Sequence, residues 1–166
     1  MGRPEVHRDL RGRNTNPIDV VLRFAQSQLY VREIGGPNAG QVVEEYQRFC
    51  GAQKGDPWCA CGVSWCGKSA LLNDWPLTVT ASCQRLYVDA KTKGLVRDAP
   101  ERGDVFLMWH ADLGRYAHCG FVEARNGLNF DTLEANTNPG GGRDGYGWFR
   151  RKRVAGTAFR FIRWAK

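Results

Sequence analysis

The sequence predicts an α+β fold, with helices in the first part of the chain and antiparallel strands in the second. Up to about residue 94 the apolar residues recur with the helical period of 3.6, whereas beyond residue 100 they alternate with the strand period of 2. Helices followed by strands are typical of this class. The 166 residues match the size of one domain. We therefore expect a basic N-terminal arm over residues 1–15 and a single domain over residues 16–166.

We expect the first helix to begin at Pro17, because Asn16 is a suitable N-cap and proline fits the first helical position. The run Gly35-Gly36-Pro37 prevents the chain from continuing as a helix. A shorter helix is expected over residues 40–49. The apolar residues of the first helix lie on one stripe: Ile18, Val21, Leu22, Ala25 and Leu29.

The third helix is expected to open with Asp56 as N-cap and Pro57 as its first residue, which places Cys59 in the first turn. A fourth helix is expected from about Thr80 to Gly94, because glycine commonly ends helices. Strand-like alternation then covers residues 104–109, 117–123 and 128–135, and a final pair of strands that ends with 158–163.

Cys59 is the candidate nucleophile. The first turn of a helix lowers the pKa of a thiol, because the helix dipole and the unpaired N–H groups favour the thiolate. The same N–H groups can bind the oxyanion of a tetrahedral intermediate. The other five cysteines are expected to be reduced thiols that pack as small apolar side chains: Cys50, Cys61, Cys66, Cys83 and Cys119.

His118 is the candidate general base, because it alone of the three histidines lies within a strand flanked by apolar residues. His7 belongs to the N-terminal arm, and His110 follows an apolar run, where a polar residue is usually just solvated. Cys119 is not expected to join His118 in one site, because neighbouring residues of a strand point to opposite faces.

Two registers are open to the hairpin that carries His118. A three-residue loop, Arg125-Asn126-Gly127, places Glu134 directly opposite His118, where its carboxylate can fix the tautomer of the imidazole. A two-residue loop, Asn126-Gly127, places Glu134 on the other face. The chemistry favours the first register. Asn136 lies on the same side as Glu134 by the strand period, and it is a candidate to supplement or replace that residue.

The stretches around these residues are EIGGPNAG at 33–40, GDPWCA at 55–60 with VSW at 63–65, GDVFL at 103–107, HCGFV at 118–122, TLEANT at 132–137, and DGYGWFRRKR at 144–153 before FIR at 161–163. Together and in this order they resemble the CHAP amidases (cysteine, histidine-dependent amidohydrolase/peptidase), especially members from bacteriophages. The resemblance covers nearly everything after residue 17.

The resemblance implies a papain-like fold and hydrolysis of an amide bond in peptidoglycan. The bond is either the N-acetylmuramoyl-L-alanine amide or a peptide bond of the stem or cross-bridge. Carried over by position, the resemblance makes Cys59 the nucleophile, His118 the general base, Glu134 the residue that orients the imidazole, and Asn136 a polar auxiliary.

The sequence departs from the family at Trp58, where many relatives have a glutamine before the nucleophile. Backbone N–H groups would then have to stabilise the oxyanion. We expect Trp58 either in the core or lining the cleft beside Cys59 as a substrate-binding residue. The loop over residues 51–56 offers one carboxylate, too few for a calcium site. We therefore expect no metal ion and no other cofactor.

The formal net charge of +7 favours anionic partners. The run Arg150-Arg151-Lys152-Arg153 suits either anionic wall polymers or lipopolysaccharide, or else protects a strand edge. No recognised nucleic-acid motif accompanies the charge, so no nucleic-acid partner is expected. We expect a monomer.

The sequence contains neither a signal peptide nor an apolar run long enough to span a membrane. We therefore expect synthesis in the cytoplasm and action on the cell wall after release by a holin, a virion or a secretion machine.

Two alternatives stay open. A non-catalytic, metal-stabilised wall-binding protein would use Cys59, Cys61, Cys66 and His118 as zinc ligands, although this cysteine spacing matches no common zinc pattern. A transpeptidase, in which an amine intercepts the acyl-enzyme, or an interbacterial toxin would use the same fold and the same residues as a phage endolysin.

Overall fold

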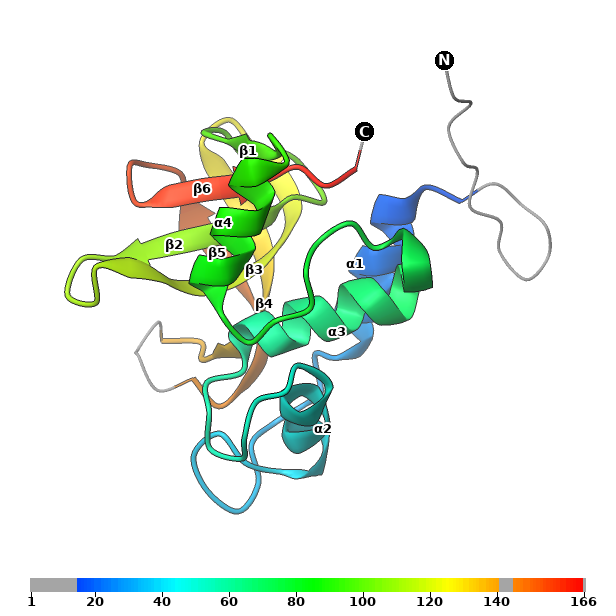
Figure 1. Ribbon diagram of the computed structural model, residues 1–166. Coiled ribbons are helices and arrows are strands. Elements are labelled where there is room, and N and C mark those ends of the chain that lie inside the picture. The colour runs from blue at the N-terminus through cyan, green and yellow to red at the C-terminus, as the bar shows by residue number, and fades with distance from the viewer. Residues whose placement is uncertain (1–14, 141–144, 166) are drawn as a thin grey trace.

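The structure is a computed structural model that describes residues 15–140 and 145–165 (Figure 1). The helices in this part of the chain are α1 (Pro17–Ser27), α2 (Gln41–Phe49), α3 (Cys59–Leu71), the short 3₁₀ helix η1 (Leu72–Asp74) and α4 (Cys83–Thr92). The predicted basic arm over 1–15 lies outside the described residues apart from Thr15.

The second half of the chain forms one antiparallel sheet with the strand order β1-β6-β2-β3-β4-β5. Its strands are β1 (Val96–Arg97), β2 (Val105–His110), β3 (Arg115–Asn126), β4 (Asn129–Thr137), β5 (Gly147–Val154) and β6 (Phe159–Ile162). Helices that precede and pack on an antiparallel sheet confirm the predicted papain-like α+β arrangement.

The predicted helix starts are confirmed for α1 and wrong for α3 and α4. Asn16 caps α1 by accepting a hydrogen bond from the amide of Ile18 at 2.9 Å. Asp56 does not cap α3, because its carboxylate instead accepts from the amide of Gln53 at 2.8 Å. α3 therefore begins at Cys59, two residues later than expected, and Cys59 is its first residue. α4 begins after its N-cap Ser82 and not near residue 80.

α3 is the central helix of the fold. It contacts the other three α-helices and strands β3 and β4, and most of its residues are buried (Figure 1). Gly62 permits this close packing, since a Cβ atom there would lie 2.7 Å from the Cβ of Ala135 and 2.8 Å from the ring of Trp148. The contact fixes the start of α3, and with it Cys59, against the sheet.

The sheet is buried on both faces. One face packs against the helices in the main core, which includes Cys119, Phe121 and Leu133 of β3 and β4. The other face holds a smaller aromatic cluster, in which the Phe130 ring lies edge-on to the rings of Phe106 and Phe161. Alternate residues of one strand therefore enter two different apolar environments.

Neither of the two predicted registers of the β3–β4 hairpin is correct. The strands are joined by a two-residue turn, Gly127-Leu128, in which Gly127 has a left-handed φ of +61°. Asn126 therefore pairs with Asn129. The favoured three-residue loop is not formed, and the alternative turn Asn126-Gly127 was predicted one residue too early, at the pair that is commoner at the centre of such a turn.

A bulge in β3 places His118 and Glu134 on the same face of the sheet, as the proposed chemistry requires. Between Val122 and Ala124 the register shifts by one residue, so that Val122 pairs with Thr132. The turn alone would place His118 and Glu134 on opposite faces of the sheet. The shift returns the two residues to one face. They are diagonal neighbours there, because Glu134 lies two residues along β4 from the position directly opposite His118.

Within the described ranges, no helix is both long enough and apolar enough to cross a membrane.

We expect Gly62→Ala to lower the free energy of unfolding. The added methyl group overlaps Ala135 and Trp148, and overpacking of this kind costs about 1–3 kcal/mol, more than the gain of up to about 1 kcal/mol in helix propensity. Thermal or denaturant unfolding measures the effect. Ser69→Ala, a change in the same helix away from this contact, is the matched control. Equal stability of the two variants would contradict the close packing of α3.

Candidate active site

The structure brings Cys59, His118 and Glu134 together from three elements. Cys59 begins α3, His118 lies on β3 and Glu134 lies on β4. The imidazole Nε2 of His118 is 2.8 Å from the Glu134 Oε2, and the thiol of Cys59 interacts with the same imidazole and helps to raise its pKa. The imidazole therefore lies between a thiol and a carboxylate, as a Cys-His-Glu mechanism requires.

The start of α3 reaches His118 because part of β3 is unpaired on the β4 side. The ladder between the two strands ends at Phe121 and Leu133, so the segment of β3 before Phe121 is accessible from that edge. The Cys59 Sγ lies 3.9 Å from the carbonyl oxygen of Ala117 in this segment. From this position the thiol contacts side chains that leave β3 on both of its faces.

Glu134 is held by more than His118. Its side chain is fully buried, and the guanidinium of Arg153 donates to both carboxylate oxygens, at 2.9 Å and 2.7 Å. The hydroxyl of Thr132 donates to the same carboxylate. A carboxylate with three fixed donors keeps its orientation, and it fixes in turn the orientation of the imidazole.

Arg153 is a site residue that the sequence analysis missed. We predicted that the run 150–153 binds anionic polymers or protects a strand edge, but two of its members pair with carboxylates of the same chain, one of them buried. Arg153 pairs with Glu134, and Arg150 pairs with Glu123 at 2.8 Å. The strand period was the available signal, because it places Arg151 and Arg153 on the inner face of β5 and Arg150 on the outer face.

The electrostatics favour a thiolate and imidazolium pair. Hydrogen bonds from the thiols of Cys119 and Cys83, together with one from His118, hold the pKa of Cys59 well below its ordinary value although burial opposes this. Burial lowers the pKa of His118, but its hydrogen bonds to Cys59 and Glu134 outweigh burial and raise the pKa to about 9.

Glu134 stays ionised for a related reason. Burial raises the pKa of its carboxyl group, but the hydrogen bonds from Arg153 and His118 outweigh burial and lower the pKa to about 2. The site then holds two anions, Cys59 and Glu134, and two cations, His118 and Arg153. These charges balance, which reduces the cost of burying them.

Asn136 does not orient His118, contrary to the prediction. The strand period breaks there, because β4 shifts register against β5 between Glu134 and Thr137, and Asn136 has a left-handed φ of +53°. Its side-chain oxygen accepts from the amide of Trp58 at 3.3 Å, and its nitrogen donates to Asn38 at 3.0 Å. Asn136 therefore positions the residue that precedes the nucleophile.

Trp58 does not line the cleft, because its side chain is 0% exposed. Its ring stacks on Tyr46 at 5.8 Å between centroids, and its Nε1 donates to Glu33 at 2.9 Å. The prediction of Trp58 as a substrate-binding residue is therefore wrong. The Glu33 carboxylate also accepts from Asn136 at 3.3 Å, so the two residues hold the chain around Trp58 from both sides.

A cleft of about 1090 Å³ opens onto the thiol and the imidazole. Its lining includes polar and charged side chains, among them Asn38, Asp56, Arg115 and Tyr146. Cys59, the first residue of α3, lines this cleft, and the first N–H groups of a helix have no partner within the helix. These groups can stabilise an oxyanion formed at the carbon that Cys59 attacks.

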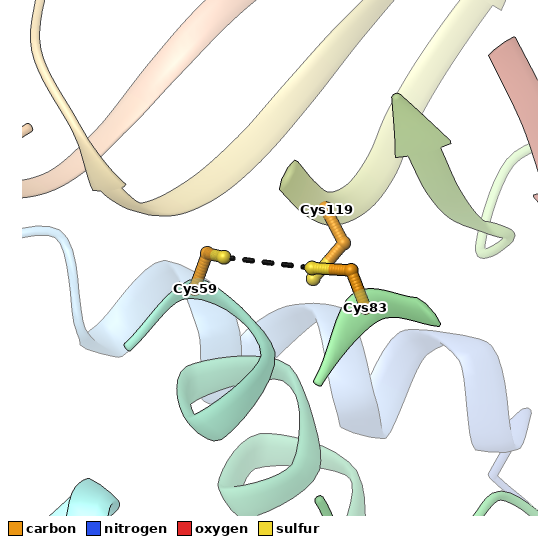
Figure 2. Close-up of side chains that lie close together, drawn as sticks. All are labelled: Cys59, Cys83 and Cys119. Carbon is orange, nitrogen blue, oxygen red and sulfur yellow. Dashed lines mark hydrogen bonds between the residues drawn. The ribbon is translucent and has the colours of Figure 1, made fainter. Parts of the chain in front are cut away.

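Three of the six cysteines meet at the site (Figure 2). The sulfurs of Cys59, Cys83 and Cys119 lie within 4.8 Å of one another, and those of Cys59 and Cys83 are 3.6 Å apart. All six thiols are free. His118 is not part of this cluster, as expected for the strand neighbour of Cys119, whose side chain points to the other face. The predicted zinc ligands Cys61 and Cys66 are not part of this cluster.

His110 also lines the cleft, whereas His7 lies outside the described residues. His118 is the histidine that the fold places between the Cys59 thiol and a carboxylate.

We expect Cys59 to react with iodoacetamide at a pH well below the ordinary thiol pKa of about 8.5. The hydrogen bonds that lower the pKa of Cys59 keep its thiolate populated. Peptide mapping by mass spectrometry gives the alkylation rate of each cysteine against pH. Burial raises the pKa of Cys66, which therefore serves as an unreactive internal control. His118→Ala should move the Cys59 profile to higher pH. An unchanged profile would show that the imidazole does not act on the thiol.

No family model and no curated protein matches the sequence. Solved structures of similar fold include two that each have a TM-score of 0.53. The crystal structure of Ly7917 is 16% identical, and that of Ly7917 with the hydrolyzing product of MDP is 15% identical. Each likeness covers 88% of this chain but 62% of the other, so the chain spans about three-fifths of the length of these proteins. At this identity the likeness establishes a shared α+β fold.

Proposed function

We propose that the protein is a cysteine amidohydrolase or peptidase of the CHAP type that cleaves an amide bond in bacterial peptidoglycan. The observation that carries the proposal is the row of Cys59, His118 and Glu134, in which a 2.8 Å hydrogen bond fixes the imidazole beside a thiol at a helix start. The substrate class is supported by the fold shared with Ly7917, which was crystallised with the hydrolyzing product of MDP, a peptidoglycan fragment.

In the first half of the proposed reaction the Cys59 thiolate attacks the carbonyl carbon of the amide. A carbon–sulfur bond forms and the carbonyl electrons move to oxygen, where the N–H groups at the start of α3 stabilise the anion. The His118 imidazolium then donates its proton to the amide nitrogen. The carbon–nitrogen bond breaks, the amine leaves, and a thioester remains on Cys59.

In the second half the neutral imidazole of His118 takes a proton from water, and the hydroxide attacks the thioester. Collapse of the second tetrahedral intermediate releases a carboxylic acid and returns the thiolate. Glu134 keeps its charge throughout, since its pKa is about 2. Arg153 does not contact the reacting atoms and is a positioning residue.

The resemblance to bacteriophage members of the family suggests a phage endolysin, which reaches the wall after release by a holin, a virion or a secretion machine. An interbacterial toxin would use the same chemistry. The muramoyl-alanine amide and a peptide bond of the stem or cross-bridge are both substrates for this mechanism, and the products distinguish them.

Cys59→Ala should lower the rate of peptidoglycan cleavage by about 10⁴-fold or more, because the variant lacks the thiol that forms the thioester. Mass spectrometry of digested peptidoglycan measures the cleavage, and a free lactyl group or a free peptide end names the bond. Cys50→Ala, at a half-buried cysteine outside the sulfur cluster, is the matched control. Fragments released equally by wild type and Cys59→Ala would exclude the mechanism. Products joined to an amine would instead indicate transpeptidation.

Activity should fall as the pH rises through about 9, because the His118 imidazolium that protonates the leaving amine is then lost. The hydrogen bond to Glu134 raises the pKa of His118, so Glu134→Gln should move this basic limb of kcat/KM to lower pH. His118→Ala should reduce kcat/KM further than Glu134→Gln does, with general acid–base catalysis worth about 10²–10⁴-fold. An unmoved limb in Glu134→Gln would show that Glu134 does not act through His118.

A further inference from the structure

We propose that the sulfurs of Cys59, Cys83 and Cys119 form a binding site for one thiophilic divalent cation, such as Zn²⁺ or Cd²⁺. A bound cation would occupy the nucleophile and hold the protein inactive. The binding site stands on geometry alone, whereas the inactivation rests on the proposed function.

The spacing of the three sulfurs suits a single ion. A tetrahedral zinc site with Zn–S bonds of about 2.3 Å separates its sulfurs by about 3.8 Å. The sulfurs of Cys59 and Cys83 are already 3.6 Å apart, and all three lie within 4.8 Å of one another (Figure 2). Small rotations of the side chains therefore bring all three sulfurs to one ion.

The backbone around the cluster favours anionic sulfur. Cys59 is the first residue of α3, and Cys83 is the first residue of α4. Two helix N-termini therefore meet at the cluster, and each places the positive end of its dipole beside a thiol. Arg115 lines the same cleft. Three thiolates around a divalent ion leave a net charge of −1. The positive ends of the two helices and the Arg115 guanidinium stabilise this charge.

Water from the cleft can fill the fourth ligand position, because Cys59 and Cys83 both line the cleft. The ring nitrogens of His118 are not among the ligand atoms that lie within 4.8 Å of one another in this cluster. Soft thiolate ligands select zinc and its thiophilic relatives over calcium or magnesium.

A cation can reach the cluster from the cleft, because Cys59 and Cys83 both line it, while Cys119 is fully buried beneath them. Each thiol that binds loses its proton to solvent, and no oxidant or reductant takes part. A sulfur bonded to a cation cannot attack an amide carbon. Cation binding and amide hydrolysis therefore exclude each other.

Titration of the reduced full-length protein with Cd²⁺ tests the site, because each Cd–thiolate bond adds a charge-transfer absorption in the ultraviolet. Wild type should bind one Cd²⁺ per chain with the intensity of three such bonds. Cys83→Ser should lose about one third of this intensity. It should also weaken Cd²⁺ binding by more than about 10-fold, because removing even a residue that only hydrogen-bonds to a metal ligand weakens binding by roughly that factor. Cys50→Ser, outside the cluster, should match wild type.

Cys119 is replaced both by Ser and by Ala, because a buried serine hydroxyl at this position can itself impair folding. Circular dichroism shows whether both variants fold. Wild type without a charge-transfer band, or a Cys83→Ser variant that binds as wild type does, would overturn the site.

Hydrolysis is measured separately, with and without stoichiometric Zn²⁺. Stoichiometric Cd²⁺ binding by a protein that cleaves no peptidoglycan would keep the metal site and reject the proposed function. Full hydrolysis with the site occupied would reject the inactivation.

Discussion

The carboxylate of Glu134 is fully buried, and a charge in such a place destabilises a fold by several kcal/mol unless it is paired and hydrogen-bonded. Its partners come from three neighbouring strands: His118 on β3, Thr132 on β4 and Arg153 on β5. The register of these strands is therefore tied to the site. A shift of any of them would separate the carboxylate from a partner and leave a charge unpaired.

A second set of polar contacts holds the other side of the site. Glu33 and Asn136 bind the indole and the amide of Trp58, which directly precedes Cys59. Gly62 lets α3 press against β4 and β5 one turn further on. The nucleophile is thus fixed by its own helix and by the loop before it, and the imidazole is fixed by the sheet. The two parts meet at the unpaired edge of β3.

Local signals in the sequence predicted local features of the structure. The class of the fold follows from apolar periodicity and the start of α1 from the capping residue Asn16, and the structure has both. Cys59 also lies in a first helical turn as predicted, although Asp56 does not cap that helix. That His118 and Glu134 meet was also expected, but for the wrong register. Asn-Gly suggested the place of the turn, whereas the bulge at Glu123 has no signature in composition or period.

The features that the sequence did not predict depend on contacts between distant segments. Asn136 breaks the strand period through a left-handed residue, and Trp58 turns into the core because Glu33 satisfies its indole nitrogen. The cluster of Cys59, Cys83 and Cys119 joins two helix starts and a strand. In the sequence each of these cysteines is indistinguishable from an ordinary buried thiol. Their spacing along the chain does not indicate that the three sulfurs lie close together.

The bulge in β3 also limits how this hairpin can vary among related sequences. The two-residue turn and the one-residue bulge each reverse the face on which His118 lies relative to Glu134, so together they cancel. A relative that lost the bulge would need a turn longer or shorter by one residue to keep the pair together. Insertions and deletions in this hairpin should therefore be inherited in compensating pairs, so that a gap near residue 123 of an alignment accompanies one near residue 127.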